Sequence, residues 1–217
     1  SNPNDVYIYT NRGFVYTKQG EYALAIADFT EALRLNPQDE NIYINRGNAY
    51  RQNGDYDRAI ADSTEAIRLN PKNPDAYINR GAVYSQDRKY TLAIADFNKA
   101  IRLNPQNLDA YINRGFAYNE KGDYIRAIAD YNEILRRDSQ NEFAYNNRAF
   151  AYDKLGEYAL AIADYDEAIR LNSQNANTYN NRGTVYDKNG NFALAIADYD
   201  EAIRLNPHYA VAYSNRA

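Results

Sequence analysis

Residues 74–107 read PDAYINRGAVYSQDRKYTLAIADFNKAIRLNPQN, and this 34-residue unit decides the fold because it recurs along the whole chain. Asn-Arg pairs follow one another at a constant step, and no insertion or deletion interrupts their register. The pairs begin at Asn11, Asn45, Asn79, Asn113, Asn147, Asn181 and Asn215. A fixed period of this length is typical of repeat proteins, in which each unit packs against its neighbours.

Each unit divides into two stretches with the spacing of an amphipathic helix. In residues 40–73 the first stretch carries Ile42, Tyr43 and Tyr50 and stops at Gly54, which suits a left-handed helix end. The second stretch begins after Asp55, a favourable N-cap residue, and ends at an Asn-Pro pair. The sequence therefore predicts helix, tight turn, helix and loop in every unit.

Composition excludes several classes of function. The chain has 217 residues, a net charge of −4 and no cysteine, and its single histidine is His208. An acidic balance argues against a nucleic-acid partner, and the absence of a long apolar run argues against membrane insertion. We find no residues spaced for catalysis, for a metal or for a cofactor, so the chain is not expected to be an enzyme.

The unit resembles the tetratricopeptide repeat (TPR) family, in a bacterial-type variant that carries NRG. Counting positions 1–34 in each unit, with NRG at positions 6–8, the family has an aromatic residue at positions 4 and 24, Gly at 8, Tyr at 11, Ala at 20 and 27, and Pro at 32. Repeat 1 matches with Tyr9, Gly13, Tyr16, Ala25, Phe29, Ala32 and Pro37. The resemblance implies an all-α fold, a right-handed superhelical solenoid of helix-turn-helix repeats, as a single array over residues 1–217. The expected repeats are 6–39, 40–73, 74–107, 108–141, 142–175 and 176–209, with a partial seventh at 210–217.

Among the departures from the pattern, those in repeats 2 and 3 concern the core and the tight turn. Repeat 2 has Ser63 in place of the aromatic residue at position 24, so that slot is either filled from elsewhere or left as a small void. Repeat 3 has Arg88 and Lys89 where other repeats place Gly and an N-cap residue. Because a left-handed conformation strains a residue other than glycine, this turn is expected to differ from the others.

An arginine at position 7 falls on the apolar face of the first helix, and a buried charge without a partner is costly. Position 23 of the second helix is Asp in every complete repeat and lies within reach. The expected pairs are Arg12 with Asp28, Arg46 with Asp62, Arg80 with Asp96, Arg114 with Asp130, Arg148 with Asp164 and Arg182 with Asp198. Pairing with the Asp of the preceding repeat is the alternative register, and Arg216 has only Asp198 available. A functional alternative is that the arginine row binds anionic ligands.

The opposite face of the first helices, at positions 2, 5, 6, 9, 12 and 13, lines the concave surface in the family and is the candidate binding groove. Asn side chains present both a donor and an acceptor to a peptide backbone, while Ile and Phe offer apolar pockets. The candidate groove residues are Tyr7, Asn11, Phe14, Ile44, Asn45, Asn48, Ile78, Asn79, Ile112, Asn113, Phe116, Phe143, Asn147, Phe150 and Asn181. A structural alternative is that Asn at position 6 serves helix packing. Positions 2, 5 and 6 carry no Lys or Arg, which favours uncharged or apolar ligands.

The resulting prediction is a protein-interaction scaffold that binds an extended peptide or partner segment. The alternatives are a structural spacer or oligomerisation array with an empty groove, and an accessory segment of an enzyme. The start SNPND resembles the end of a repeat, so we expect the sequence to be a piece of a larger protein. End-to-end self-association through apolar repeat ends is a further expectation. The compartment is not determined by these residues, with the cytoplasm as the default.

Overall fold

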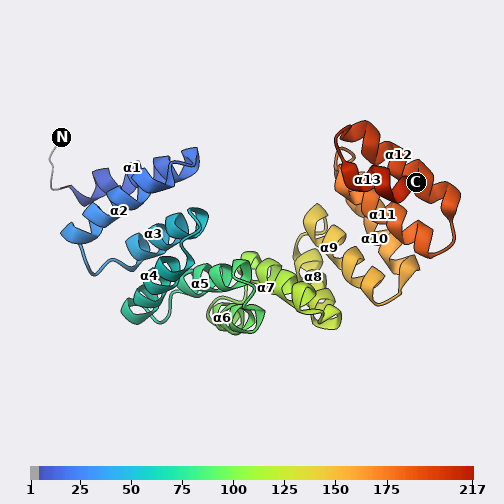
Figure 1. The fold of residues 1–217 in the computed structure, drawn as a ribbon. Helices are drawn as coiled ribbons and strands as arrows, with labels where there is room; N and C mark the ends of the chain where they lie inside the picture. The colour runs from blue at the N-terminus through green and yellow to red at the C-terminus, as the bar shows by residue number, and fades with distance from the viewer. Residues whose placement is uncertain (1–4) are drawn as a thin grey trace. The chain divides into compact units, whose positions relative to one another are not determined.

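The computed structural model describes residues 5–217, so the SNPN part of the sequence start lies outside the described residues. These residues form thirteen α-helices and no strand (Figure 1). The helices are α1 (Val6–Gln19), α2 (Tyr22–Leu35), α3 (Glu40–Gln52), α4 (Tyr56–Leu69), α5 (Pro74–Gln86), α6 (Tyr90–Leu103), α7 (Leu108–Lys121), α8 (Tyr124–Arg137), α9 (Glu142–Lys154), α10 (Tyr158–Leu171), α11 (Ala176–Lys188), α12 (Phe192–Leu205) and α13 (Ala210–Arg216). The predicted all-α class is thereby confirmed.

The chain divides into two compact units, Ser1–Asn113 (unit 1) and Arg114–Ala217 (unit 2). In unit 1, α1 packs on α2, α3 on α4 and α5 on α6, and α2 and α4 also contact the first helix of the next repeat. In unit 2, α9 packs on α10 and α11 on α12, while α8, α10 and α12 contact the helix that follows them. Within each unit these helices thus pack against their sequence neighbours, as expected for stacked repeats.

The ends of the helices have clear local causes. Side chains of Asp5, Asp39 and Asn73 accept a hydrogen bond from the backbone of α1, α3 and α5, which satisfies an otherwise free N–H group. Five turns between the two helices of a repeat contain a glycine with φ of 78–81°. That left-handed conformation costs glycine little, so the turn can be short.

The turn of repeat 3 has the same form as the others, which makes the expected difference wrong. Arg88 adopts φ of 56° and is the only non-glycine residue with positive φ in the described chain. Its N–H donates to the carbonyl of Ser85, and Lys89 N–H donates to Tyr84. Gly54 and Asp55 make the equivalent bonds to Arg51 and Tyr50 in repeat 2. The packed helices therefore impose the left-handed turn although the residue is not glycine.

We predict that Arg88→Gly raises the free energy of unfolding by about 1 kcal/mol, because it removes the strain of a side chain in the left-handed region. Urea unfolding monitored by circular dichroism measures the change. The reverse substitution Gly54→Arg, at a glycine with φ of 81°, is the control and is expected to destabilise by a similar amount. A lower unfolding midpoint in Arg88→Gly would contradict this account.

In repeats 1, 3, 4 and 6 the glycine at position 8 meets the aromatic ring at position 24 in the core. A Cβ placed on Gly13 would lie 2.9 Å from Phe29, and one on Gly115 would lie 3.0 Å from Tyr131. In repeat 2, Ser63 replaces the ring, is fully buried, and donates its hydroxyl to the carbonyl of Ala59 at 2.8 Å. The hydroxyl is therefore satisfied within its own helix.

Candidate functional site

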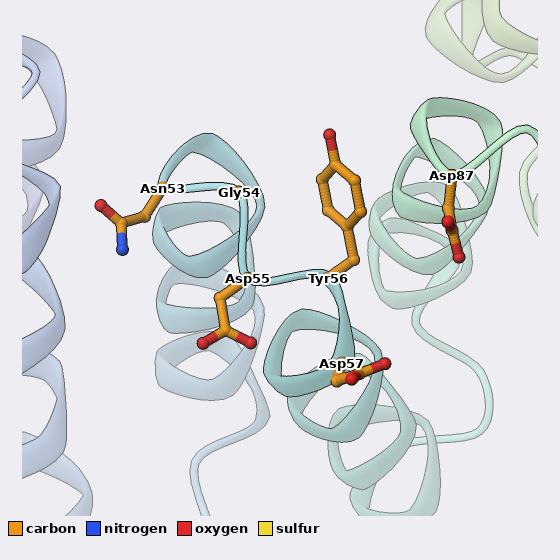
Figure 2. Close-up of a pocket in the computed structure, with 6 residues that line it drawn as sticks. All are labelled: Asn53, Gly54, Asp55, Tyr56, Asp57 and Asp87. Carbon is orange, nitrogen blue, oxygen red and sulfur yellow. The ribbon is translucent and has the colours of Figure 1, made fainter.

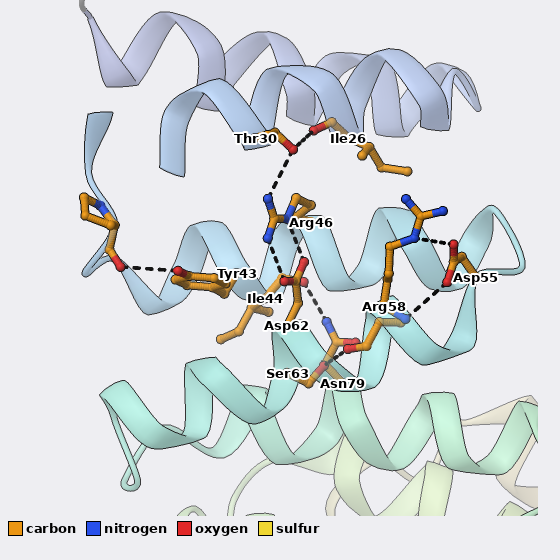
Figure 3. Close-up of polar contacts among 12 residues, drawn as sticks. Ile26, Thr30, Tyr43, Ile44, Arg46, Asp55, Arg58, Asp62, Ser63 and Asn79 are labelled. Atoms are coloured by element: carbon orange, nitrogen blue, oxygen red, sulfur yellow. Dashed lines mark hydrogen bonds and ion pairs between the residues drawn. The ribbon is translucent and has the colours of Figure 1, made fainter. Parts of the chain in front are cut away.

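Every arginine at position 7 of the six complete repeats forms two hydrogen bonds with the Asp sixteen residues further along. Nε and Nη2 donate to the two carboxylate oxygens at 2.6–2.9 Å, a bidentate geometry that only arginine provides. The arginine pairs with the Asp of its own repeat, as in the first of the two registers considered. Figure 3 shows the pair formed by Arg46 and Asp62.

Arg46, Arg80, Arg148 and Arg182 also reach back to the preceding repeat. Nη1 of Arg46 donates to Thr30 Oγ1 at 3.1 Å, and Nη1 of Arg148 donates to Asn132 Oδ1 at 2.6 Å (Figure 3 shows the former). Both acceptors occupy position 25 of the repeat before. One guanidinium therefore joins the two helices of its own repeat and the second helix of the previous repeat, which fixes how neighbouring repeats stack.

Two tyrosines of the same helix flank the guanidinium. The Arg148 guanidinium carbon lies 5.5 Å from the centre of the Tyr145 ring and 5.9 Å from that of Tyr152. A cation at this distance from a ring face is attracted by the π electrons. Since the side chain of Arg148 is only 19% exposed, the tyrosine columns at positions 4 and 11 also shield the ion pair from water.

Arg216 does not pair with Asp198, so that expectation is wrong. Its Nε lies 2.8 Å from an oxygen of Asp200, at position 25 of repeat 6. Asp198 is held by Nε and Nη2 of Arg182, the arginine of its own repeat. Arg216 therefore contacts position 25 of the preceding repeat, the position that Arg46 and Arg148 contact with Nη1.

The structure brings part of the predicted groove set together in unit 1. Side chains from α3, α5 and the start of α7 surround a cavity of about 340 Å³, here called the groove cavity. It is lined by Ile44, Asn45, Asn48, Arg51, Asp75, Ile78, Asn79, Ala82, Asp109 and Asn113. Ile44, Asn45, Asn48, Ile78, Asn79 and Asn113 were predicted from the sequence. Its volume is at the lower end of the range for ligand pockets.

The other predicted groove residues lie elsewhere. Phe14 lines a second cavity of about 270 Å³ that shares Asn45 and Asn48 with the groove cavity. Tyr7 and Asn11 are exposed on α1, and Ile112 is partly buried; none of the three lines either cavity. In unit 2, Phe116 and Phe143 are exposed, whereas Asn147, Phe150 and Asn181 are partly buried.

Several asparagines at position 6 use their amide N–H groups inside the protein. Asn79 Nδ2 donates to the carbonyl of Ile44, in the preceding repeat, at 2.8 Å (Figure 3). Asn113 and Asn147 donate to the carbonyl four residues earlier in their own helices, at 2.7 and 2.8 Å. In contrast, Asn79 Oδ1 is buried and has no hydrogen-bond partner. Asn79 therefore serves helix packing through Nδ2, while its Oδ1 is a buried, unsatisfied acceptor.

Sequence reasoning missed Arg51, the cation of the groove cavity. Its Nη2 donates to Asn48 Oδ1 at 2.7 Å, while its Nε is buried without a partner. Burial lowers the pKa of the Arg51 guanidinium. The available signal was its place at position 12, on the groove face, where repeats 1, 3 and 4 carry Thr17, Ser85 and Asn119.

A third cavity, of about 500 Å³, opens beside the turn between α3 and α4 (Figure 2). It is lined by Asn53, Gly54, Asp55, Tyr56, Asp57 and Asp87. Two of its carboxylates have partners, because Asp55 accepts from Arg58 Nε at 2.6 Å and Asp87 pairs with Lys89 at 2.6 Å. Among the described residues no cluster of His, Cys, Asp and Glu has the arrangement of a metal site. Capping and ion pairs therefore account for Asp55 and Asp87.

Family models cover most of the chain. The models are described as TPR repeat and as Tetratricopeptide repeat. The TPR repeat model matches residues 13–54, 47–87 and 151–190. One Tetratricopeptide repeat model matches 74–107 and 176–209, and another matches 97–129. With its paired helices and the repeated glycine–aromatic contact, the chain belongs to the tetratricopeptide repeat family, a class of protein-interaction scaffolds.

Solved structures show the same fold at low sequence identity. The type IV pilus biogenesis factor PilW has a TM-score of 0.88 and 19% identity, with 96% of this chain and 97% of that chain covered. YrrB, described as a TPR protein with an unusual peptide-binding site, has a TM-score of 0.70 and 23% identity, covering 86% and 96%. A chain of the APC/C hetero-tetramer Cut9-Hcn1 has a TM-score of 0.83 and 21% identity, and the match spans 99% of this chain but only 42% of that one.

A protein from Parabacteroides merdae has a TM-score of 0.75 and 24% identity, with 100% of this chain and 84% of that chain covered. The comparison with curated proteins gave no significant match. Over residues 5–217, none of the helices combines the length and the hydropathy that crossing a bilayer requires. The identities are low enough that these neighbours establish the fold and leave the ligand open.

Proposed function

We propose that the chain is a scaffold that binds an extended peptide segment of a partner protein in the groove cavity of unit 1. The observation that carries this proposal is the alternation of asparagines and apolar side chains around the cavity. Ile44 and Ile78 supply apolar surface, and Asn45, Asn48, Asn79 and Asn113 supply polar atoms. An extended peptide presents both kinds of group along its length.

The hydrogen bonds of the asparagines fix which peptide groups they suit. Asn113 uses one of its two Nδ2 hydrogens for a backbone carbonyl, which leaves its Oδ1 and its second amide hydrogen for a ligand. An Oδ1 atom accepts a hydrogen bond, so its natural partner is a peptide N–H group.

A binding experiment tests the proposal. A random peptide library displayed on phage is selected on the immobilised protein, and selected peptides are synthesised and titrated by fluorescence anisotropy. We expect Ile78→Ala combined with Asn45→Ala to weaken binding by about tenfold or more, because both an apolar contact and an acceptor are lost. Circular dichroism checks that the variant remains folded.

Leu92→Ala is the matched control, since Leu92 is a large apolar residue on α6 that is 49% exposed and does not line the groove cavity. This variant is expected to bind the selected peptides as tightly as the unchanged chain. If selection yields no binding peptide, or if the groove variant binds equally well, the spacer alternative is favoured over the peptide-binding scaffold.

A further inference from the structure

The groove cavity carries opposite charges on side chains from opposite ends of its helices. Arg51 lies in the last turn of α3, whereas Asp75 and Asp109 lie in the first turns of α5 and α7. Since α3 is followed by the packed helix α4 and then by α5, two reversals give α3 and α5 the same direction. The cation and the carboxylates are therefore separated along the helix direction.

The separation can be estimated from repeat positions. Arg51 occupies position 12 and Asp75 occupies position 2, so ten residues of helix separate their levels. At about 1.5 Å per residue this corresponds to roughly 15 Å along the helices. An extended peptide covers about 3.3 Å per residue, so roughly four or five residues span that distance.

Arg51 has no charged partner in the protein. Among the residues that the structure describes, no carboxylate forms an ion pair with its guanidinium, and Nε is buried without a hydrogen bond. The arginines at position 7 differ in this respect, because each of them holds a carboxylate. A partly buried guanidinium that lacks a counter-charge is stabilised when a ligand supplies one.

A second cation extends the positive end. Lys18, near the end of α1, lines the neighbouring cavity that shares Asn45 and Asn48 with the groove cavity. Its ammonium nitrogen lies 5.2 Å from the centre of the exposed Phe14 ring. In contrast, Asp75 and Asp109 are exposed at the other end and attract a positive charge.

We propose that the groove cavity selects a peptide with an acidic side chain that pairs with Arg51 and a basic side chain that lies near Asp75 and Asp109. This inference rests on the proposed function, because it requires a peptide in the groove cavity. The charge order also fixes the direction of the bound segment, since the reversed peptide places like charges together. Like charges at close range disfavour the wrong orientation.

Short synthetic peptides with capped ends test the inference. Each probe has the central sequence Leu-Ser-Leu-Ser between two terminal residues, carries a fluorescent label, and is titrated by anisotropy. The terminal pairs are Glu and Lys, Lys and Glu, Gln and Gln, Glu and Glu, and Lys and Lys. The Gln probe reports binding without charge, and the two mixed probes report the effect of charge order.

We expect one mixed probe to bind about tenfold more tightly than the Gln probe, as a charge-assisted hydrogen bond would give. Arg51→Gln is expected to remove most of this advantage, so that the mixed probe and the Gln probe bind this variant with similar affinity, and circular dichroism checks that the variant is folded. The matched control is Arg58→Gln, because Arg58 is an exposed arginine that already pairs with Asp55. Asp75→Asn combined with Asp109→Asn is expected to remove the preference for the basic residue.

Two results would overturn the inference in distinguishable ways. If the Gln probe binds and the mixed probes bind no more tightly, charge selection is refuted while the peptide-binding function stands. The same conclusion follows if Arg51→Gln keeps the full advantage of the mixed probe. If neither these probes nor the peptides selected from the library bind, the peptide-binding function fails together with the inference.

Discussion

Replacing Asp130 by Ala is expected to lower the free energy of unfolding by about 3 kcal/mol, because Arg114 is left inside the protein without its carboxylate. Nε and Nη2 of Arg114 donate to the two oxygens of Asp130 at 2.9 and 2.6 Å. The Asp130 side chain is 5% exposed and that of Arg114 is 18% exposed, so water compensates only in part. Urea unfolding followed by far-ultraviolet circular dichroism measures the loss.

The double variant Arg114→Leu/Asp130→Ala is expected to regain most of this stability, since an apolar replacement of a buried ion pair is often close to neutral. At the end of the array, Asp28→Ala is expected to cost less, because its partner Arg12 is 52% exposed. An unchanged unfolding midpoint in Asp130→Ala would show that the pair is not structural.

The sequence alone was sufficient to predict the fold, because most repeats keep the same pattern even where one of them departs from it. Six copies of the alanine at position 20 and the tyrosine at position 11, with glycine at position 8 in five repeats, specify helix pairs even where one repeat departs, as at Ser63. The turn at Arg88 shows the limit of local reasoning. Propensity argued for a different turn, but the helices on both sides pack in the common way and impose the left-handed conformation. The free energy gained by packing these helices therefore outweighs the cost of the left-handed conformation, which is about 1 kcal/mol.

The sequence predicted only one of the two kinds of contact that the arginines at position 7 make. The contact of Arg12 with Asp28 follows from burial and spacing, but the backward contact of Arg46 with Thr30 requires the orientation of one repeat on the next. A signal existed, since position 25 holds Thr, Asn or Asp in every complete repeat and all three accept hydrogen bonds. Recognising it would have predicted Asp200 as the partner of Arg216.

The groove was harder to predict because position on a helical wheel does not define a cavity. Asn45, Asn79 and Asn113 meet around one space in unit 1, whereas Tyr7 on the same nominal face is simply exposed. Arg51 was missed because arginine occupies position 12 in one repeat only. A search for residues that recur at the same repeat position overlooks such a residue. Residues that recur at one repeat position serve mainly the stacking of repeats. A side chain that differs from those at the same position in other repeats is therefore a better indicator of ligand selectivity.

Gly81→Val is expected to lower the free energy of unfolding by about 3 kcal/mol, because a side chain at this position meets a buried ring. A Cβ on Gly81 would lie 2.6 Å from Cε1 of Phe97, which is fully buried and has no room to withdraw. Ala149 occupies the same position in repeat 5 and packs in one cluster with Tyr165, so the fold accepts a single methyl group there. Valine exceeds that size, and urea unfolding measures the cost.

Ala82→Val, on the neighbouring residue of α5, separates packing from helix propensity. Ala82 is only partly buried, so its substitution is expected to cost no more than about 0.7 kcal/mol, the difference in propensity between the two residues. Phe97→Leu in the Gly81→Val background is expected to restore space, so the double variant loses less stability than the sum of the two single losses. Strict additivity would mean that the glycine is not required by the ring, and that the contact between the first and second helices of the repeat tolerates greater separation.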